Sequence, residues 1–331
     1  MLRLEKLNCF ADLHLHLDGA ISLRSARMLA ERQKIALPES DAELLALLRV
    51  PDGCTDLNMF LSCFDFPCSL LQTAEGIRLA VANLLDELAE QGVMYAELRF
   101  APQKSTDCGL TQEEAVQAAL AGIHGIPAKL ILCCMRGEDN RAENEETIRL
   151  AAKYLGKGVA AADLAGAEAL FPTRDFADLF ALARELGVPF TIHAGEADGA
   201  ESVRTALAFG ASRIGHGVRA EEDPALVKEL AERQIPLEMC PTSNLDTATV
   251  HDLRDWPLRR YLEVGVPVTI NTDDPGIVGT TLREEYRKLI SAFDLRDAEV
   301  RMLLENGVRA SFAEETKKTE LLGKIAASCS D

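Results

Sequence analysis

Short apolar segments alternate with amphipathic helical patterns along almost the whole chain, and this alternation limits the folds that the sequence can adopt. Segments of this kind are typical of strands that are buried on both faces of a sheet. Eight of them are predicted as strands, at residues 8–16, 93–100, 128–135, 158–164, 188–193, 213–216, 235–240 and 266–271. Strands that alternate with helices predict a parallel sheet, because parallel neighbours need a crossover connection.

The later strands are followed by helical patterns at residues 111–124, 142–154, 174–186, 201–209, 224–233, 257–264 and 282–292. Together with the first strand, they make eight strand–helix units, which predict an α/β fold closed into a (β/α)8 barrel of the TIM type. An open doubly wound sheet is the alternative. Such a sheet more often carries a glycine-rich phosphate loop, and neither G-x-G-x-x-G after the first strand nor a Walker A sequence occurs in the chain.

The connection between the first two strands is unusually long. Residues 17–92 form a helical insertion of about seventy residues, where a barrel normally has a short loop and one helix. Helices are predicted there at 22–33, 41–49 and 73–91, and an apolar stripe at helical spacing lies between the last two. Because active sites lie at the C-terminal ends of barrel strands, we expect this insertion to help build the pocket. Two extra C-terminal helices, 298–310 and 313–325, are expected outside the barrel.

Composition narrows the class of protein and its partners. No linker interrupts the 331 residues, so 1–331 is predicted to be a single domain, and 47% hydrophobic residues suffice for its core. A formal charge of −18 argues against nucleic acid and against an anionic membrane surface as partners. No apolar run is long enough to span a bilayer, and the N-terminus has no apolar signal core. Nine cysteines without a C-x-x-C pair are expected to be reduced, which predicts a cytoplasmic protein.

Side chains suited to metal binding stand at the C-terminal ends of four predicted strands. Four of the six histidines lie there. His14 and His16 should share one face of their strand, because successive strand side chains alternate. The strand ends of a barrel meet around one mouth, so the sequence predicts that these groups come together. They are His14, His16, His193, His216, Asp273 and Asp274.

Three imidazoles and one carboxylate can hold zinc and leave a position for water. His14, His16, His193 and Asp273 provide that set, and we expect them to bind one Zn²⁺ per chain. Zinc lowers the pKa of bound water to about 7, so the site could supply hydroxide near neutral pH.

Hydrolysis at such a site also needs a base for the water and an acid for the substrate. Glu196, His216 and Asp274 are predicted to carry out these proton transfers. For Asp274, the alternative role is that of a helix N-cap or turn residue before Pro275.

Seven motifs together resemble those of the adenosine deaminase family in the amidohydrolase superfamily. They occur in the order and spacing of that family, over roughly residues 8 to 320. His-x-His alone is a common pattern, whereas the ordered set is very specific. The motifs are 14–19 (HLHLDG), 96–102 (AELRFAP), 163–166 (DLAG), 193–196 (HAGE), 215–217 (GHG), 240–244 (CPTSN) and 271–275 (NTDDP).

The resemblance implies roles for the polar residues at the strand ends. Glu196 resembles the acid that protonates N1 of the purine. His216 and Asp274 resemble the pair that orients and deprotonates the attacking water. The residues that resemble the zinc ligands are His14, His16, His193 and Asp273.

Other positions resemble the substrate-binding residues of the family. Asp18 resembles the carboxylate that binds the ribose hydroxyls, and Gly166 resembles the backbone donor to purine N3. His16 is expected to contact the substrate as well as the metal. The stripe of Leu57, Phe60, Leu61 and Phe64 resembles an apolar lid over the nucleoside, although ordinary core packing is the commoner meaning of such a stripe.

Three positions bear on the choice of substrate. The related adenine deaminases generally have Glu where this chain has Asp18, so the aspartate favours a nucleoside over a free base. Ala167 stands where Asp is frequent, and Trp256 stands before Pro257 where His is common. These two departures are expected to tune substrate contacts and to leave activity in place. The lack of a basic cluster at the strand ends argues against AMP.

The resemblance therefore implies zinc-dependent hydrolytic deamination of adenosine, and of 2′-deoxyadenosine, to the inosine product and ammonia in purine salvage. The expected partner is a small purine nucleoside. One alternative keeps the mechanism and changes the substrate to adenine or a modified adenosine. Another is a non-catalytic metal- or purine-binding barrel, against which Glu196, His216 and Asp274 argue, because binding alone does not need groups for proton transfer.

Overall fold

The computed structural model describes residues 4–51, 54 and 57–329, and the side chains of 57–59 lie outside the described part. All eight predicted strands are confirmed. They are β1 (Phe10–His16), β2 (Val93–Phe100), β3 (Ala128–Met135), β4 (Val159–Ala165), β5 (Thr191–Ala194), β6 (Arg213–His216), β7 (Leu237–Met239) and β8 (Val268–Ile270). β7 and β8 are shorter than predicted. Each begins directly after a proline, Pro236 or Pro267, which lacks the N–H that a strand ladder needs.

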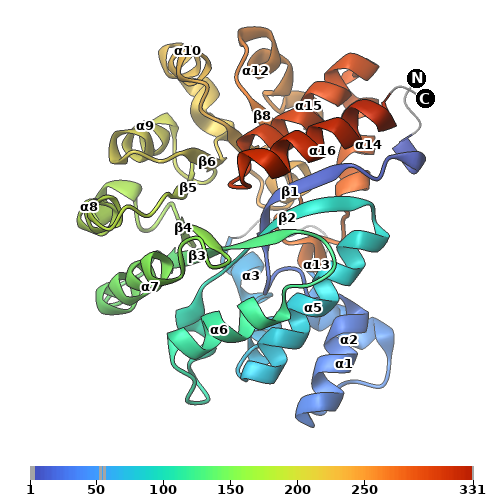
Figure 1. Ribbon diagram of the computed structural model, residues 1–331, viewed down its shortest axis with the longest axis vertical. Helices are drawn as coiled ribbons and strands as arrows, with labels where there is room; N and C mark the ends of the chain where they lie inside the picture. Colours follow the sequence, from blue (N-terminus) through green and yellow to red (C-terminus); the bar gives the residue numbers. More distant parts are fainter. Residues whose placement is uncertain (1–3, 52–53, 55–56, 330–331) are drawn as a thin grey trace.

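The strands close into the predicted (β/α)8 barrel. Parallel pairing joins β1 to β4 in order and β5 to β8 in order. Single parallel bridges join the two groups, one between Ala162 and Phe190 and the other between Leu15 and Asp273. Figure 1 shows the strands at the centre of a ring of helices. The second bridge includes Asp273, so the backbone pairing that closes the barrel also positions this predicted ligand.

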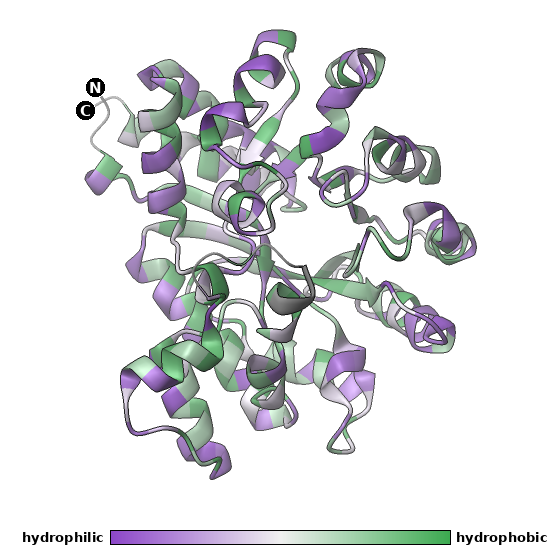
Figure 2. Ribbon diagram, turned by 180° about the vertical axis from the view of Figure 1, so that it is seen from behind, coloured by the Kyte–Doolittle hydropathy of each residue, from purple (hydrophilic) through white to green (hydrophobic). Residues whose placement is uncertain are grey.

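The helices of the ring are α6 (Gln112–Gly122), α7 (Arg141–Tyr154), α8 (Ala177–Glu185), α9 (Ala200–Phe209), α10 (Pro224–Arg233), α12 (Leu258–Val264) and α14 (Leu282–Phe293). Their starts follow ordinary capping rules. Thr111 and Glu114 form a capping box at α6, and the Asp223 side chain caps α10 ahead of Pro224. Figure 2 shows hydrophobic strands at the centre and helices with both hydrophilic and hydrophobic faces around them.

The insertion consists of α1 (Leu23–Gln33), α2 (Asp41–Leu48), α3 (Leu57–Ser62), α4 (Asp65–Ser69) and α5 (Ala74–Glu90). Ser22 and Thr73 cap α1 and α5 through their side-chain oxygens. The apolar stripe that was expected on one helix is divided, because α3 ends in a turn in which the Phe64 N–H bonds to the Leu61 carbonyl at 3.2 Å. Phe64 therefore lies between two short helices.

The C-terminal helices α15 (Asp297–Ala310) and α16 (Glu315–Ser328) lie outside the barrel, as expected (Figure 1). α15 packs against β8 and β1 and so covers the place where the barrel closes. A Cβ atom at Gly307 would lie 3.5 Å from the Cβ of Ala11, which brings the helix close to β1. Among the helices of the described residues, none combines the length and the apolar character that crossing a membrane requires. Short helical turns complete the chain at Leu4–Lys6, Pro102–Ser105, Thr173–Phe176, Val218–Glu222, Leu253–Asp255, Pro241–Asp246 (α11) and Pro275–Val278 (α13).

Candidate active site

The four predicted metal ligands converge at the mouth of the barrel. His14 Nε2 and His16 Nε2 lie 3.0 and 3.2 Å from His193 Nε2. Asp273 Oδ1 lies 3.1 Å from His14 Nε2 and 3.3 Å from His16 Nε2. Ligand atoms around a tetrahedral zinc ion with bonds of ~2.1 Å are about 3.4 Å apart, so this donor set fits such an ion. The prediction that His14 and His16 share one face is confirmed.

The backbone at Asp273 adopts a conformation that is uncommon for a residue with a side chain. Its φ is 62°, in the left-handed region. Two hydrogen bonds of 2.8 Å hold it against β1, one from the His16 N–H to the Asp273 carbonyl and one from the Asp273 N–H to the His14 carbonyl. Strain of this kind persists only where surrounding structure enforces it, and here the enforcing element is the strand that carries two of the histidines.

Carboxylates behind the histidines orient two of the rings. His14 Nδ1 lies 2.8 Å from Glu238 Oε2, and His193 Nδ1 lies 3.0 Å from Asp163 Oδ2. A carboxylate accepts, so Nδ1 carries the proton in each ring and Nε2 faces the centre with its lone pair. Burial lowers the pKa of His14. Burial acts in the same direction on His193, but the Asp163 carboxylate outweighs it and the net pKa is raised.

Two buried arginines hold these carboxylates in turn. Arg99 Nη1 lies 2.9 Å from Asp163 Oδ2, and Arg99 Nη2 lies 2.7 Å from Glu238 Oε2. Arg213 Nε lies 2.6 Å from Glu238 Oε1, and all four side chains are at most 1% exposed. Burial alone would raise the pKa of Glu238, but the two arginines outweigh it and keep the pKa well below its usual range. Arg99 comes from the motif at 96–102, which the sequence analysis matched without assigning a role.

A second group of donors lies beside the first in the described residues and consists of His216, Cys240 and Asp273. The Cys240 thiol donates to the Glu238 carbonyl at 3.5 Å, and burial raises its pKa well above the usual value. Metal binding needs the thiolate, so this group fits an ion less well than the three histidines and Asp273.

Asp274 is buried at the edge of the metal-binding group. It occupies the N-cap position of α13, but its side chain makes no capping hydrogen bond. Its Oδ1 atom has no hydrogen-bond partner within the part of the chain that the structure describes. Burial, and after it the charge of Asp273, raises the pKa of Asp274 well above its usual value. A Cβ atom at Gly19 would lie 1.7 Å from Asp274 Oδ1, so the glycine of the first motif makes room for this carboxyl.

Glu196 and His216 border the same group. Glu196 Oε2 lies 3.5 Å from His216 Nε2, which lies 3.8 Å from Asp273 Oδ2. Burial raises the pKa of Glu196, which favours its protonated form. Thr247 Oγ1 donates to Glu196 Oε1 at 3.2 Å. The structure thus gathers Glu196, His216 and Asp274, which we call the proton-transfer residues, around the metal-binding group, while their roles stay predictions.

Glu168 is a residue that the sequence analysis did not single out. Its buried carboxylate accepts a 2.5 Å hydrogen bond from Ser202 Oγ and four bonds from consecutive backbone N–H groups of the loop that carries Glu196. Those donors are Gly195 (2.8 Å), Glu196 (3.0 Å), Ala197 (2.7 Å) and Asp198 (3.0 Å). Glu168 therefore holds this loop in place. Its position two residues after the motif at 163–166 is the sequence signal that could have identified it.

The predicted substrate-binding residues lie at different depths of the mouth. Asp18 is close enough to Asp274 for its charge to raise the pKa of that carboxyl. Burial raises the pKa of Asp18 itself, and the Cys68 thiol of α4 lies 3.7 Å from its Oδ2. Gly166 directly follows β4 with a φ of 103°, a conformation that favours glycine.

The apolar lid stays a prediction. The side chain of Leu57 lies outside the described residues. Phe60 is buried, and its ring packs edge-on against Phe64 with 6.0 Å between centroids. This contact agrees equally with a lid and with local packing of the insertion.

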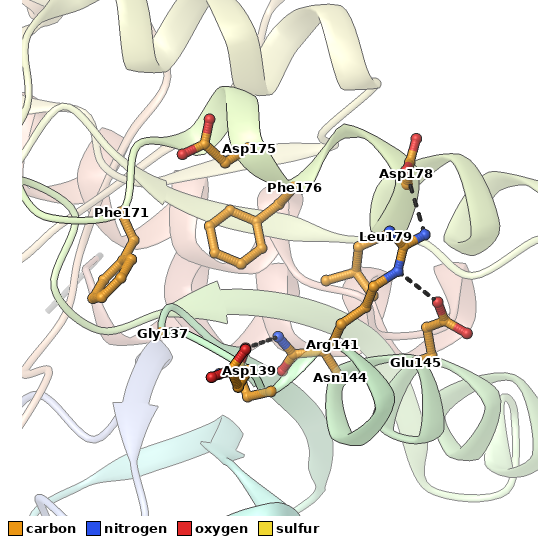
Figure 3. Close-up of a pocket in the computed structure, with 11 residues that line it drawn as sticks. Gly137, Asp139, Arg141, Asn144, Glu145, Phe171, Asp175, Phe176, Asp178 and Leu179 are labelled. Carbon is orange, nitrogen blue, oxygen red and sulfur yellow. Dashed lines mark hydrogen bonds and ion pairs between the residues drawn. The ribbon is translucent and has the colours of Figure 1, made fainter.

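A separate cavity lies between the loops after β3 and β4, next to the first turns of α7 and α8 (Figure 3). It has a volume of ≈ 200 Å³, and Phe171 and Phe176 contribute rings to its wall. Arg141 crosses its rim to Glu145 and Asp178, at 3.1 and 3.3 Å. None of the predicted site residues with a described side chain lines it, so the cavity is distinct from the histidine group.

Both the sequence and the fold of this chain are similar to those of known deaminases. The family model described as adenosine deaminase matches residues 10–328. The adenosine deaminase of Haemophilus ducreyi is 50% identical over 325 residues, covering 95% of this chain and 94% of that protein. The one from Enterococcus faecalis is 40% identical over 320 residues, covering 95% of each. A crystal structure of adenine deaminase from Arthrobacter aurescens superposes with a TM-score of 0.88 at 29% identity, covering 98% of this chain and 99% of that one. The chain belongs to the adenosine deaminase family.

Proposed function

We propose that this protein catalyses zinc-dependent hydrolytic deamination of adenosine, and of 2′-deoxyadenosine, to the corresponding inosine and ammonia. One observation carries the proposal. Three histidine Nε2 atoms and one carboxylate oxygen come together with four of their separations between 3.0 and 3.3 Å. Beside them lies the buried Asp274, whose Oδ1 has no hydrogen-bond partner among the described residues. A metal site beside a carboxyl that can exchange a proton suits the addition of water to a purine ring.

The metal-binding group would hold one Zn²⁺ per chain through His14, His16, His193 and Asp273. Zinc in such a site acts as a Lewis acid and lowers the pKa of water that it binds to about 7. Glu238 and Asp163 set the tautomers that this binding requires, because each accepts the Nδ1 proton of a ligand histidine.

The proton-transfer residues divide the remaining work. Glu196 donates a proton to N1 of the purine, which makes C6 electrophilic, and its raised pKa suits this role. Asp274 accepts a proton from the attacking water and passes it to the C6 amino group, which leaves as ammonia. The second proton of the water leaves the C6 hydroxyl as the C6 carbonyl forms, and it restores the Glu196 carboxyl. His216 orients the water from the side of β6. His216 and Asp274 are buried and the Glu196 side chain is 19% exposed, so little bulk water competes for these protons.

Substrate binding would use Asp18 for the ribose hydroxyls, the Gly166 backbone for purine N3 and His16 beside the ring. Leu57 and Phe60 would cover the nucleoside from the insertion. The net charge of −18 suits a neutral nucleoside better than a nucleotide or a nucleic acid.

The substrate is tested by following ultraviolet absorbance changes of zinc-loaded protein with adenosine, 2′-deoxyadenosine, adenine and AMP. We expect kcat/KM for the two nucleosides to exceed that for adenine and AMP by at least about tenfold. Adenine has no ribose to contact Asp18, and AMP adds a charged phosphate. Faster turnover of adenine than of the nucleosides would show that adenine is the substrate. That alternative is supported by the 29% identity with the adenine deaminase of Arthrobacter aurescens. If the protein turned over none of these purines, the proposal that it is a deaminase would be rejected.

A non-catalytic binding barrel is tested by Glu196→Gln. The amide preserves size but does not supply the acid proton, so kcat should fall by about 10²- to 10⁴-fold while zinc content, measured by mass spectrometry, stays near one ion per chain. Full activity in Glu196→Gln would show that another group protonates N1.

A further inference from the structure

Trp256 is the single tryptophan of the chain, and it is buried behind the proton-transfer residues at 2% exposure. It stands between the turn Leu253–Asp255 and α12. Its indole Nε1 donates a hydrogen bond to Asn244 Oδ1 at 3.2 Å. Asn244 belongs to α11, which follows β7, and it is fully buried. The Asn244 amide nitrogen lies 3.1 Å from His216 Nδ1.

The direction of these hydrogen bonds follows from the chemistry of the three groups. An indole N–H can only donate, so the oxygen of the Asn244 amide must face Trp256. The NH₂ group of Asn244 must then face His216, and it also can only donate. His216 Nδ1 is therefore the acceptor. In a neutral imidazole one nitrogen accepts and the other carries the proton, so the proton of His216 lies on Nε2.

Nε2 is the atom that His216 turns toward the active site. It faces two acceptors, Glu196 Oε2 at 3.5 Å and Asp273 Oδ2 at 3.8 Å. The position of the ring is secured separately. The His216 backbone has a φ of 59°, and the Tyr261 hydroxyl contacts the Gly217 and Val218 carbonyls at 2.9 and 2.8 Å. What Trp256 and Asn244 add is the choice of nitrogen that carries the proton.

We infer that Trp256 and Asn244 are positioning residues that hold His216 as a hydrogen-bond donor toward the reacting water. The inference rests on the proposed function, since it divides the water-handling work assigned there. With its proton on Nε2, His216 presents no lone pair to the site, so it orients the water by donating to an oxygen. Asp274 is left as the acceptor of the water proton. The buried pair also explains why a tryptophan before Pro257 leaves the site intact, because its ring supplies an N–H to Asn244.

The inference is tested by ¹⁵N NMR of histidine-labelled protein, with and without zinc, in which His216 is identified by comparison with His216→Asn. Protonated and unprotonated ring nitrogens resonate far apart, so the spectrum reports the tautomer directly. We expect an unprotonated Nδ1 and a protonated Nε2 in the unaltered chain. In the proton spectrum of the same protein, the indole N–H of the single tryptophan should exchange slowly with solvent and give one separate resonance.

Two substitutions change the hydrogen bonds in opposite ways. Trp256→Phe removes the donor to Asn244 and should produce a mixture of His216 tautomers. Asn244→Asp supplies a carboxylate that accepts from both neighbours and should move the His216 proton to Nδ1. Each variant should lower kcat by about tenfold, as expected for loss of one well-placed hydrogen bond, with KM within about twofold and zinc content unchanged. Trp256→His, which restores a ring N–H, should recover the original tautomer in part.

A protonated Nδ1 in the unaltered chain would overturn the inference, and so would an unchanged His216 spectrum in Asn244→Asp. The two variants are independent. If Trp256→Phe folds poorly, the His216 spectra of Asn244→Asp and of the unaltered protein still test the inference. The NMR measurement needs no substrate. Failure to deaminate adenosine would therefore reject the proposed function without affecting the tautomer result, and a reversed tautomer would reject the inference while adenosine turnover stood.

Discussion

The metal-binding group and the proton-transfer residues are neighbours, but they are supported by different kinds of side chain. Behind His14 and His193 stand the carboxylates Glu238 and Asp163, paired with buried arginine. Behind His216 stands the neutral amide of Asn244, and the described residues offer Asp274 Oδ1 no partner.

The difference follows from what each set must do. A carboxylate partner fixes the tautomer of a ligand histidine and makes its other nitrogen a better donor to a metal. The same partner beside an acid or base would compete for the proton that has to move. Neutral neighbours can aim a proton-transfer residue without holding its proton. The most informative tests of this comparison substitute a residue of one set, or of its support, and measure whether the function of the other set is retained.

The largest effect is expected for Asp274→Asn. The amide cannot accept the proton of the attacking water, so kcat should fall by about 10²- to 10⁴-fold. Zinc content should not change, because Asp274 lies beside the metal-binding group and not within it. Steady-state kinetics and metal analysis check both points, with exposed Asp178→Asn as the matched control. Loss of zinc from Asp274→Asn would contradict the separation of the two sets.

Arg99→Met should be the most damaging change to the support of the metal-binding group. It leaves Asp163 and Glu238 without the buried cation that they share, and breaking a buried ion pair costs about 3–5 kcal/mol in the free energy of unfolding. Urea denaturation of zinc-free protein measures this cost. Arg141→Met removes a surface arginine and should cost at most about 1 kcal/mol. Equal effects of the two variants would show that the buried network is dispensable.

Glu238→Gln should weaken zinc binding without removing any zinc ligand. His14 loses its anionic partner, and such outer partners are typically worth about 10- to 100-fold in metal affinity. Competition with a chelator measures the dissociation constant, and exposed Glu232→Gln serves as the control. The comparison is sharpened if Asn244→Asp, in the helix that follows the same strand, leaves the zinc affinity within about twofold. Unchanged affinity in Glu238→Gln would remove the role assigned to the carboxylate.

The smallest effect is expected for Glu168→Gln. The substitution replaces one accepting oxygen by an NH₂ group that faces backbone N–H donors, which should loosen the loop of Glu196. Hydrogen bonds to charged groups are worth about 1.5–3 kcal/mol, but the remaining oxygen keeps part of them, so we expect kcat to fall by about tenfold. Zinc affinity should not change. Glu201→Gln, at an exposed position in the first turn of α9, is the control. Equal kcat values in the two variants would show that the loop keeps its conformation without Glu168.

Local sequence patterns predicted the architecture closely. β2, β3 and β6 have the expected bounds, because apolar runs flanked by Gly or Pro are local signals. The apolar stripe at 57–64 was misjudged as one helical face, since periodicity does not reveal where a helix must end. Glu168, Arg99 and Asn244 received no role, because each acts through a partner far away in the sequence.

The sequence by itself determined the order of eight strands and helices and, through residue type, which side chains could bind a metal or move a proton. These are properties of short segments, which hydrophobic periodicity and chemical character record directly. Only the tertiary structure decided which nitrogen of His14, His193 and His216 faces the site. That choice depends on whether a carboxylate or an amide stands behind the ring, and those partners arrive from β4, β7 and α11 only when the barrel closes.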